Sequence, residues 1–317
     1  MSTAFVFPGQ GSQAIGMGRA LAEAFPAARE LFEEVDDALE QDLSRLMFEG
    51  SPADLTLTEN AQPALMAVSL AVLRVMEREG NIRLADRVAF VAGHSLGEYS
   101  ALAAAGAFTV ADAARLLRRR GRAMQEAVPV GEGAMAALLG LDVAEAEAVA
   151  AAAAEAIGEG AVCAAANDNA PGQVVVSGST AAVEKAMALA VERGAKRGIM
   201  LPVSAPFHCS LMAPAAEVMA QALAGAKLAP PVVPLVANVT AAAVQHPDSI
   251  RTLLVEQVTG RVRWRESVLY MKDKGVTRLF ELGAGKVLSG LARRIDRDLD
   301  AQAAGQPAEI EAMLKLL

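Results

Sequence analysis

The 317-residue sequence is poor in aromatic residues and almost free of cysteine. Phe, Trp and Tyr together make up 4% of the chain, although hydrophobic residues make up 53%. The core must therefore consist mainly of Ala, Val, Leu and Met, which suits close packing of helices against a sheet. The two cysteines, Cys163 and Cys209, match neither a metal-binding spacing nor a disulfide framework. We expect a reducing compartment, the cytoplasm, and no metal site.

Long apolar runs and an excess of positive charge are also missing. The longest alanine tract, residues 148–154, is flanked by glutamates and is too short to span a bilayer. Residues 8–11 contain Pro and Gly where a secretory signal would continue as an apolar segment. The formal net charge of -8 disfavours attraction of the whole chain to nucleic acid or anionic lipid. We therefore expect a protein that binds neither nucleic acid nor membrane, and nothing in the sequence requires more than a monomer.

The pentapeptide at residues 93–97 carries the strongest chemical signal, the pattern G-x-S-x-G. An apolar run, residues 88–92, precedes it, and an amphipathic segment follows from Glu98. This is the strand, sharp turn and helix in which the central serine becomes a nucleophile. The turn predicts that the Ser95 hydroxyl stands clear of the sheet, with the Leu96 N–H directed toward it as half of an oxyanion hole. A serine in an ordinary strand-to-helix loop is the alternative interpretation.

The order of predicted elements indicates two domains. Residues 134–139, 161–166, 174–177 and 199–203 are expected strands, and residues 143–157 and 180–192 are expected helices. A β-α-β-β-α-β order is typical of a ferredoxin-like domain. We predict that this small domain, residues 129–201, is inserted into a large α/β-hydrolase-like domain with a parallel sheet, formed by residues 1–128 and 202–317. We expect a loop at residues 167–172 and a weakly held tail from Asp300.

The predicted helix at residues 110–127 carries three consecutive arginines at positions 118–120. Successive side chains on a helix point about 100° apart, so at least one of the three is expected to face the protein body. A buried guanidinium needs an anionic partner. Because no acidic residue lies within one turn of these arginines, we expect the ligand to supply that anion.

A nucleophilic serine needs a base, and the sequence contains only three histidines. His94 adjoins Ser95 and is expected to point away from it, and His246 lies in a predicted loop. His208 follows a predicted strand at a loop-to-helix junction, so we expect it to be the base. The group that orients His208 stays open: the acids between serine and histidine, such as Asp168, fall in the small domain, and a backbone carbonyl could serve instead.

Two glycine-rich turns resemble nucleotide-binding motifs only in part. Residues 9–14 fit G-x-G-x-x-A, but the second strand ending in an acid does not follow. We interpret this segment as a loop whose N–H groups face an anion or an oxyanion, and a turn without a ligand is the alternative. Residues 283–286 lack the spacer and the Ser/Thr of a P-loop, which excludes that interpretation.

Taken together, the motifs resemble those of the malonyl-CoA:acyl-carrier-protein transacylases of type II fatty acid synthesis. The resemblance covers essentially the whole chain and rests on residues 7–13, 93–98, 120–121, 167–178, 207–208 and 283–288. It implies an acyltransferase with no bound cofactor, whose substrates are malonyl-CoA and a phosphopantetheinylated acyl carrier protein. A malonyltransferase subunit of a malonate decarboxylase shares the motifs and stays a possible interpretation. A serine thioesterase or esterase, or a non-catalytic module that binds carrier proteins, would be a protein of a different class.

The resemblance also assigns roles to individual residues. It implies a malonyl ester on Ser95, His208 as base and then acid, and the backbone carbonyl of Gln257 as the group that orients His208. The oxyanion hole would combine the N–H groups of Gln10 and Leu96. Arg120 is implied to bind the malonyl carboxylate, and Phe207 to narrow the space for an α-methyl branch.

Acyl carrier proteins are acidic, as is this chain, so docking requires a local basic patch. The candidate docking residues are basic side chains expected to border the cleft between the two domains: Lys196, Arg197, Lys286, Arg293 and Arg294. Ordinary solvated charges are the alternative interpretation of each.

Overall fold

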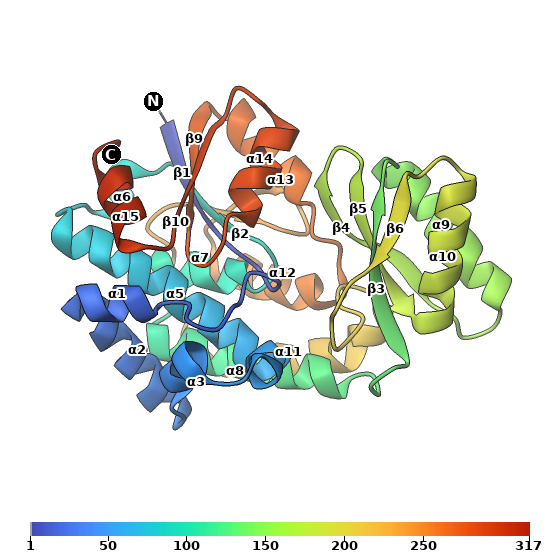
Figure 1. Ribbon diagram of the computed structural model, residues 1–317, viewed down its shortest axis with the longest axis horizontal. Coiled ribbons are helices and arrows are strands. Elements are labelled where there is room, and N and C mark those ends of the chain that lie inside the picture. The colour runs from blue at the N-terminus through green and yellow to red at the C-terminus, as the bar shows by residue number, and fades with distance from the viewer. Residues whose placement is uncertain (1) are drawn as a thin grey trace.

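Strand β1 (Ser2–Phe7) lies in the middle of the larger of two sheets in the computed structural model, which describes residues 2–317 (Figure 1). The sheet has the order β10-β9-β1-β2-β7-β8, and only β8 runs antiparallel to its neighbour. Its other strands are β2 (Phe90–Gly93), β7 (Leu235–Ala237), β8 (Ala242–Val244), β9 (Val276–Leu282) and β10 (Asp300–Ala304). Phe7 of β1 is in register with Gly93 of β2, so the loops that follow these two strands are neighbours.

Alternate residues of β1 face opposite sides of this sheet, and each side is covered by helices. Phe5 and Phe7 pack into the larger core, whereas Ala4 and Val6 pack against Trp264 on the other side. The helices around the larger core are α1 (Arg19–Ala24), α2 (Pro26–Leu39), α3 (Leu43–Glu49), α4 (Pro52–Thr56), α5 (Thr58–Glu79), α6 (Leu84–Arg87), α7 (Gly97–Ala104), α8 (Val110–Glu126), α11 (Ala213–Gly225), α12 (Pro247–Thr259) and α15 (Pro307–Leu314). The opposite side is covered by α13 (Trp264–Asp273) and α14 (Val287–Ile295).

Helix α5 is the central helix of the larger core and packs against α2, α7 and α8. It is buried along most of its length, as its many Ala, Leu, Val and Met residues require. Across residues 2–317, however, this helix and every other one falls short of the length and apolarity needed to cross a membrane.

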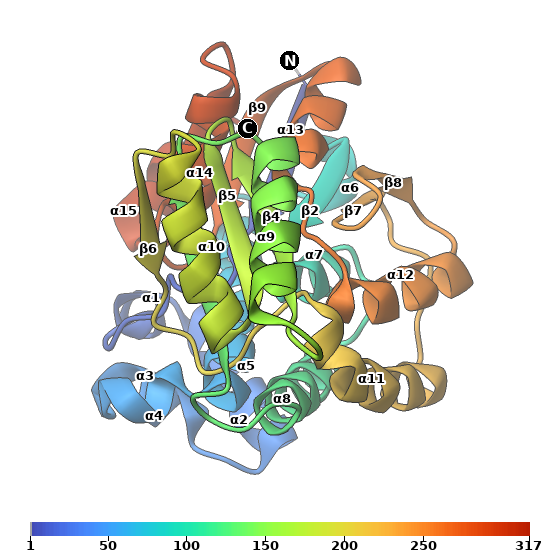
Figure 2. The ribbon, with the colours of Figure 1, turned by 90° about the vertical axis from the view of Figure 1, so that its right-hand side faces the viewer.

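The second sheet belongs to a smaller unit with its own core, which we call the small unit. Its strands are β3 (Gly133–Leu139), β4 (Cys163–Ala170), β5 (Gln173–Ser179) and β6 (Arg197–Met200), in the antiparallel order β4-β5-β3-β6. Helices α9 (Val143–Ile157) and α10 (Thr180–Glu192) cover one face, as Figure 2 shows. Asp142 caps α9 with a reciprocal capping box to Glu145, which explains why that helix begins where it does.

The expectation of a loop at residues 167–172 is wrong for its first four residues. Strand β4 continues through Ala170, with irregular register at two points, and only the following two residues turn. Polar side chains suggested a loop, but two of them have partners that the sequence does not reveal. Asp168 receives a bidentate hydrogen bond from Arg265, and Asn169 bonds to His94 at 2.8 Å.

The expectation of a weakly held tail from Asp300 is also wrong. Residues of β10 pair in parallel with β9 from Asp300 to Ala304, and α15 then packs on α5. The burial of Ala301, Ala304, Ile310 and Met313 holds this tail in place. Alanine-rich segments give a weak periodic signal, which is why the sequence did not indicate these elements. The β7–β8 hairpin was not expected either, and β6 ends at Met200 rather than at residue 203.

The corner between β2 and α7 is too tight for side chains at its two glycines. A Cβ atom on Gly93 would lie 1.9 Å from the carbonyl of Gly97, and one on Gly97 would lie 2.2 Å from the carbonyl oxygen of Phe7. Both clashes are with backbone, which cannot rotate away. The corner can therefore form only with glycine at these positions.

We predict that Gly97→Ala lowers the free energy of unfolding by about 3 kcal/mol, the upper end of what overpacking costs. Gly290→Ala is the matched control, because Gly290 lies in α14 with open space around its Cβ position. That substitution is expected to be neutral or stabilising by up to about 1 kcal/mol. Urea unfolding measures both changes, and equal midpoints for the two variants would contradict the prediction.

Candidate active site

The corner after β2 presents Ser95 at the start of α7, in a strained backbone conformation. Its φ of 53° lies in the left-handed region, which is uncommon for a residue other than glycine. Asn238, just after β7, holds the corner from the next strand: its Oδ1 accepts from the Ser95 N–H at 2.8 Å, and its Nδ2 donates to the Gly93 carbonyl at 2.7 Å. The neighbouring strand thus keeps the serine in place.

The Ser95 hydroxyl is in contact with His208. Ser95 Oγ lies 2.8 Å from His208 Nε2, and the other ring nitrogen, Nδ1, lies 2.8 Å from the Gln257 carbonyl oxygen and 3.1 Å from that of Gly260. Because carbonyls can only accept, Nδ1 carries the proton and Nε2 is left free to accept one from Ser95. His208 itself has a φ of 59°, a second strained residue at the site.

The environment keeps His208 uncharged. Burial, together with the positive charge on Arg120, lowers the pKa of His208 to about 3. No carboxylate contacts the ring within residues 2–317, so the acceptors on Nδ1 are both main-chain carbonyls. Asp168, which the sequence left open as an orienting acid, instead pairs with Arg265.

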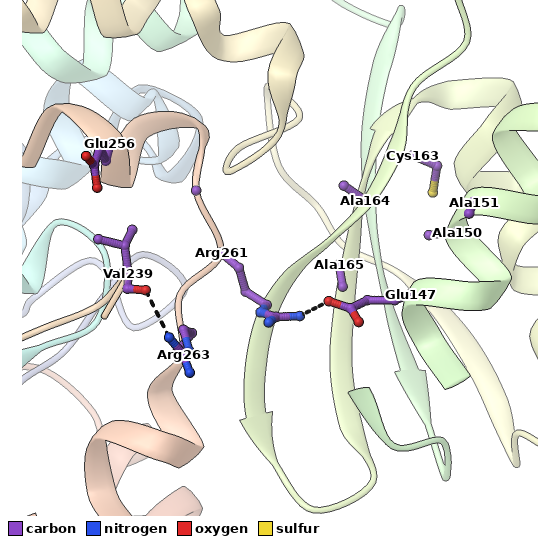
Figure 3. A pocket seen from close by; sticks show the side chains of 11 residues that line it. Glu147, Ala150, Ala151, Cys163, Ala164, Ala165, Val239, Glu256, Arg261 and Arg263 are labelled. Atoms are coloured by element: carbon purple, nitrogen blue, oxygen red, sulfur yellow. Dashed lines mark hydrogen bonds and ion pairs between the residues drawn. The ribbon is translucent and has the colours of Figure 1, made fainter. Parts of the chain in front are cut away.

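The segment that carries Gly260 is attached to the small unit. Val262 donates to the Ala166 carbonyl and accepts from the Asp168 N–H, each at 2.9 Å, which adds a short parallel bridge to β4. Arg261 reaches across the groove between the two parts of the molecule and pairs with Glu147 on α9, as Figure 3 shows. The small unit therefore helps to position Gly260, whose carbonyl is one of the two that contact His208 Nδ1.

Arg120 is the arginine of the 118–120 run that turns inward. It is 1% exposed, and its guanidinium donates to Gln62 Oε1 at 2.9 Å, to Gln257 Oε1 at 2.9 Å and to Ser95 Oγ at 3.1 Å. All these acceptors are neutral, and no ion pair in the described part of the chain involves Arg120. Its neighbours do not enter the site: the half-buried Arg118 donates to the Glu59 carbonyl, and Arg119 is exposed. The site thus contains a buried cation with no anionic partner.

A cavity of about 140 Å³ lies in front of Ser95 and Arg120, between the larger sheet and the small unit. Residues of both parts line it: Gln10, Gln62, His94, Ser95, Leu96, Arg120, Met124, Met135, Asn167, Asn169, Val175, Leu201, Val203, Phe207 and His208. The N–H groups of Gln10 and Leu96 make no backbone hydrogen bond among residues 2–317. The cavity has room for a short acyl group, and the two residues with unengaged N–H groups are among those that line it.

Unlike the residues around Ser95, the candidate docking residues do not form a single cluster. Lys196 and Arg197 lie at the start of β6, at the Leu139 end of the small sheet. Arg294 extends from α14 to Gln173 at the β4–β5 turn, which pairs with the same end of β3. Two others have partners within the large sheet region: Lys286 pairs with Glu309 at 2.9 Å, and Arg293 donates to the Ala301 carbonyl. The structure therefore places Arg294 at the same end of the small unit as Lys196 and Arg197, whereas Lys286 and Arg293 bond to residues outside it.

Several polar residues of the site were not predicted from the sequence. Gln62, Asn238 and Glu98 lie buried around Arg120 and Ser95, and neutral amides carry no spacing signature. Asn238 is the first residue after β7 (Leu235–Ala237), a strand end that the sequence does not mark. His94 makes no hydrogen bond to Ser95 and instead contacts Asn169, although its ring borders the same cavity.

Within residues 2–317, no group of three or more His, Cys, Asp or Glu side chains could hold a metal ion.

A serine on a strand–helix corner, a neutral imidazole on its hydroxyl and two unengaged N–H groups are typical features of enzymes that form an acyl-serine. Residues 4–288 match the acyl transferase domain family, and the chain belongs to this family.

Named proteins that are similar to this chain agree with this assignment. The chain is 48% identical over 314 residues to a malonyl CoA-acyl carrier protein transacylase of Bacillus subtilis, covering 99% of this chain and 96% of that protein. The structure resembles that of an acyl-carrier-protein-S-malonyltransferase from Bartonella henselae, with a TM-score of 0.95, 58% identity and coverage of 100% and 99% of the two chains. It also resembles a malonyl-transacylase solved in complex with its type II PKS acyl-carrier protein, with a TM-score of 0.94, 41% identity and full coverage of both chains.

We predict that Ser95 keeps its reactivity toward an uncharged fluorophosphonate between about pH 6 and pH 4.5. A histidine with an ordinary pKa of about 6.5 would lose roughly tenfold in neutral base per pH unit over this range. The lowered pKa of His208 keeps the base unprotonated until about pH 3. Stopped labelling followed by intact mass gives the rate, with circular dichroism as the control for folding. A tenfold fall per pH unit in folded protein would contradict the prediction.

Proposed function

We propose that the chain transfers a malonyl group from malonyl-CoA to the phosphopantetheine thiol of an acyl carrier protein, through a malonyl ester on Ser95. One observation carries the choice of acyl group: the buried Arg120 guanidinium has only neutral partners and lies 3.1 Å from the nucleophile. A cation in that position fits the free carboxylate of a short diacid thioester. The names of the relatives, and the complex of one of them with its carrier protein, support the same assignment.

The first half-reaction follows from the contacts around Ser95. His208 Nε2 takes the hydroxyl proton as Oγ bonds to the thioester carbonyl carbon, and the N–H groups of Gln10 and Leu96 receive the oxyanion. Collapse of this intermediate breaks the carbon–sulfur bond. His208 then returns the proton to the departing coenzyme A thiolate, which leaves malonyl-Ser95.

The second half-reaction repeats these steps with a different thiol. The phosphopantetheine thiol gives its proton to His208 and attacks the ester carbonyl, and the proton returns to Ser95 Oγ when the ester bond breaks. Every group comes from one chain, so a monomer suffices. Phe207, which is buried at the cavity wall, would limit room beside the α-carbon of the acyl group.

The charge of the substrate assists the base. Arg120 contributes to the low pKa of His208, and a malonyl carboxylate bound to Arg120 would offset that effect. Imidazole therefore becomes a better base when the correct acyl group occupies the site. An uncharged acyl group would leave the cation unpaired and the imidazole weakly basic.

We predict that incubation with malonyl-CoA yields one covalent malonyl adduct, located on Ser95 by peptide mass analysis. Addition of phosphopantetheinylated acyl carrier protein is expected to remove the adduct and to produce malonyl-carrier protein. Ser95→Ala is the control that should remain unmodified. Loss of the adduct to free malonate without carrier protein would instead favour a thioesterase.

We predict that Arg120→Ala reduces the formation of the malonyl adduct by an amount equivalent to about 2–5 kcal/mol, the cost of removing one partner of a buried charge pair. Arg119→Ala is the matched control, because Arg119 is its exposed neighbour on α8. Labelling by an uncharged fluorophosphonate checks that Ser95 still reacts in both variants. Equal malonyl-CoA kinetics for the two variants would contradict the role of Arg120.

We propose that the basic residues at one end of the small sheet help to dock the acidic carrier protein. Lys196, Arg197 and Arg294 lie at this end, whereas Lys286 and Arg293 have partners elsewhere. Reversal of charge at Lys196 and Arg197 is expected to raise the KM for carrier protein about tenfold and to leave malonyl adduct formation from malonyl-CoA unchanged. Lys227→Glu, an exposed site after α11, is the control. An unchanged KM for carrier protein would end this proposal.

A further inference from the structure

Glu98 is a buried acid beside the active site that the proposed reaction does not use. It is the second residue of α7 and is 1% exposed. It makes no hydrogen bond to Ser95 Oγ or to His208, so it cannot be the general base. One of its oxygens, Oε1, has no hydrogen-bond partner among residues 2–317. Burial raises the pKa of this carboxyl to about 7.

The other oxygen of Glu98 faces the side chain of Gln257. Gln257 Nε2 donates to Glu98 Oε2 at 2.5 Å and to the Ser95 carbonyl at 3.0 Å. The same Glu98 oxygen accepts from the Asn238 N–H at 3.3 Å. Glu98 therefore contacts both residues that hold the Ser95 corner from outside.

Gln257 connects three parts of the site through different atoms. Its side-chain Oε1 accepts from Arg120, and its main-chain carbonyl accepts from His208 Nδ1 at 2.8 Å. The side-chain amide can be placed in two orientations, which exchange its oxygen and nitrogen. A flipped amide would place an NH₂ group against the Arg120 guanidinium, donor against donor.

A carboxylate next to this amide selects one orientation. Glu98 Oε2 accepts from the main-chain N–H of Asn238, so it faces Gln257 as an acceptor. It therefore requires the NH₂ of Gln257 and directs the amide oxygen toward Arg120. The amide also separates the acid from the cation, so Arg120 keeps its charge available for a substrate. A buried acid that served packing alone would cost stability compared with an apolar residue.

We propose that Glu98 is a positioning residue, which fixes the side chain of Gln257 so that Arg120 is aligned for the acyl carboxylate and His208 for Ser95. This inference rests on the proposed malonyl transfer and adds a determinant of its specificity. Glu98 acts through Gln257 and touches neither substrate nor the reacting atoms.

Two substitutions separate this role from a purely structural one. Glu98→Leu removes the acceptor, and Glu98→Gln keeps an oxygen for Gln257 Nε2. We expect Glu98→Leu to raise the KM for malonyl-CoA at least about tenfold, the effect of one charge-assisted hydrogen bond, and to slow fluorophosphonate labelling of Ser95. Glu98→Gln should restore the labelling rate to within about threefold of wild type. Glu126→Leu, an exposed site on α8, is the control for a lost surface acid.

Rates are normalised to the concentration of active sites, so that loss of folded protein does not imitate the effect. An unchanged KM in Glu98→Leu, with a loss of kcat only in proportion to active sites, would overturn the proposal. If wild-type protein forms no malonyl adduct, the proposed function fails, whereas the labelling rates still test Glu98.

An exchange of the two residues gives a further test if Glu98→Leu does not fold. The double variant Glu98→Gln/Gln257→Glu keeps a hydrogen bond between positions 98 and 257 but places the carboxylate against Arg120. We expect at least about a tenfold loss of malonyl adduct formation and fluorophosphonate labelling within about fivefold of wild type. Malonyl-CoA kinetics equal to those of wild type would overturn the proposal.

Discussion

The site depends on one buried guanidinium that is surrounded by neutral acceptors. Arg120 loses its hydration and receives oxygens from two amides and a hydroxyl in return, but no opposite charge. Such an arrangement is costly in a folded chain and becomes favourable when an anion arrives. In the proposed malonyl transfer, the carboxylate of the acyl group would supply that anion.

This constraint also explains why main-chain carbonyls, and not a carboxylate, accept from the His208 imidazole. A carboxylate on His208 Nδ1 would lie close to the guanidinium and would compete with the substrate for it. The carbonyls of Gln257 and Gly260 fix the tautomer without adding charge. Glu98, a buried acid close to the site, is joined to Arg120 by hydrogen bonds through the amide of Gln257. The hydrogen-bond acceptors of Arg120 are thus all neutral.

Sequence reasoning predicted the parts of this arrangement that follow from local geometry. The strand–turn–helix pattern around Ser95 and the small number of histidines led to the Ser95–His208 contact, and the run at 118–120 led to an inward arginine. The helix at residues 143–157 was also predicted at its observed length.

The features that sequence reasoning did not predict depend on contacts between residues that lie far apart in the chain. Gln62 and Asn238 contribute single amide groups, and no spacing rule links them to Ser95. Asn169 and Asp168 suggested a loop because their partners, His94 and Arg265, lie at least seventy residues away in sequence. Likewise, β10 and α15 are held by alanines and a few larger apolar residues. Their pattern in the sequence does not predict a strand and a helix, because β10 is stabilised by its pairing with β9.

The bridge between Val262 and β4 has a consequence for the modularity of this enzyme. The small unit looks like an insertion that could be exchanged between relatives, since it has its own sheet and core. Yet its strand β4 is joined to the segment whose Gly260 carbonyl touches the imidazole. A chimera that grafts a foreign small unit would need residues 260–265 from the same donor, and the two segments are expected to be co-inherited when such proteins recombine.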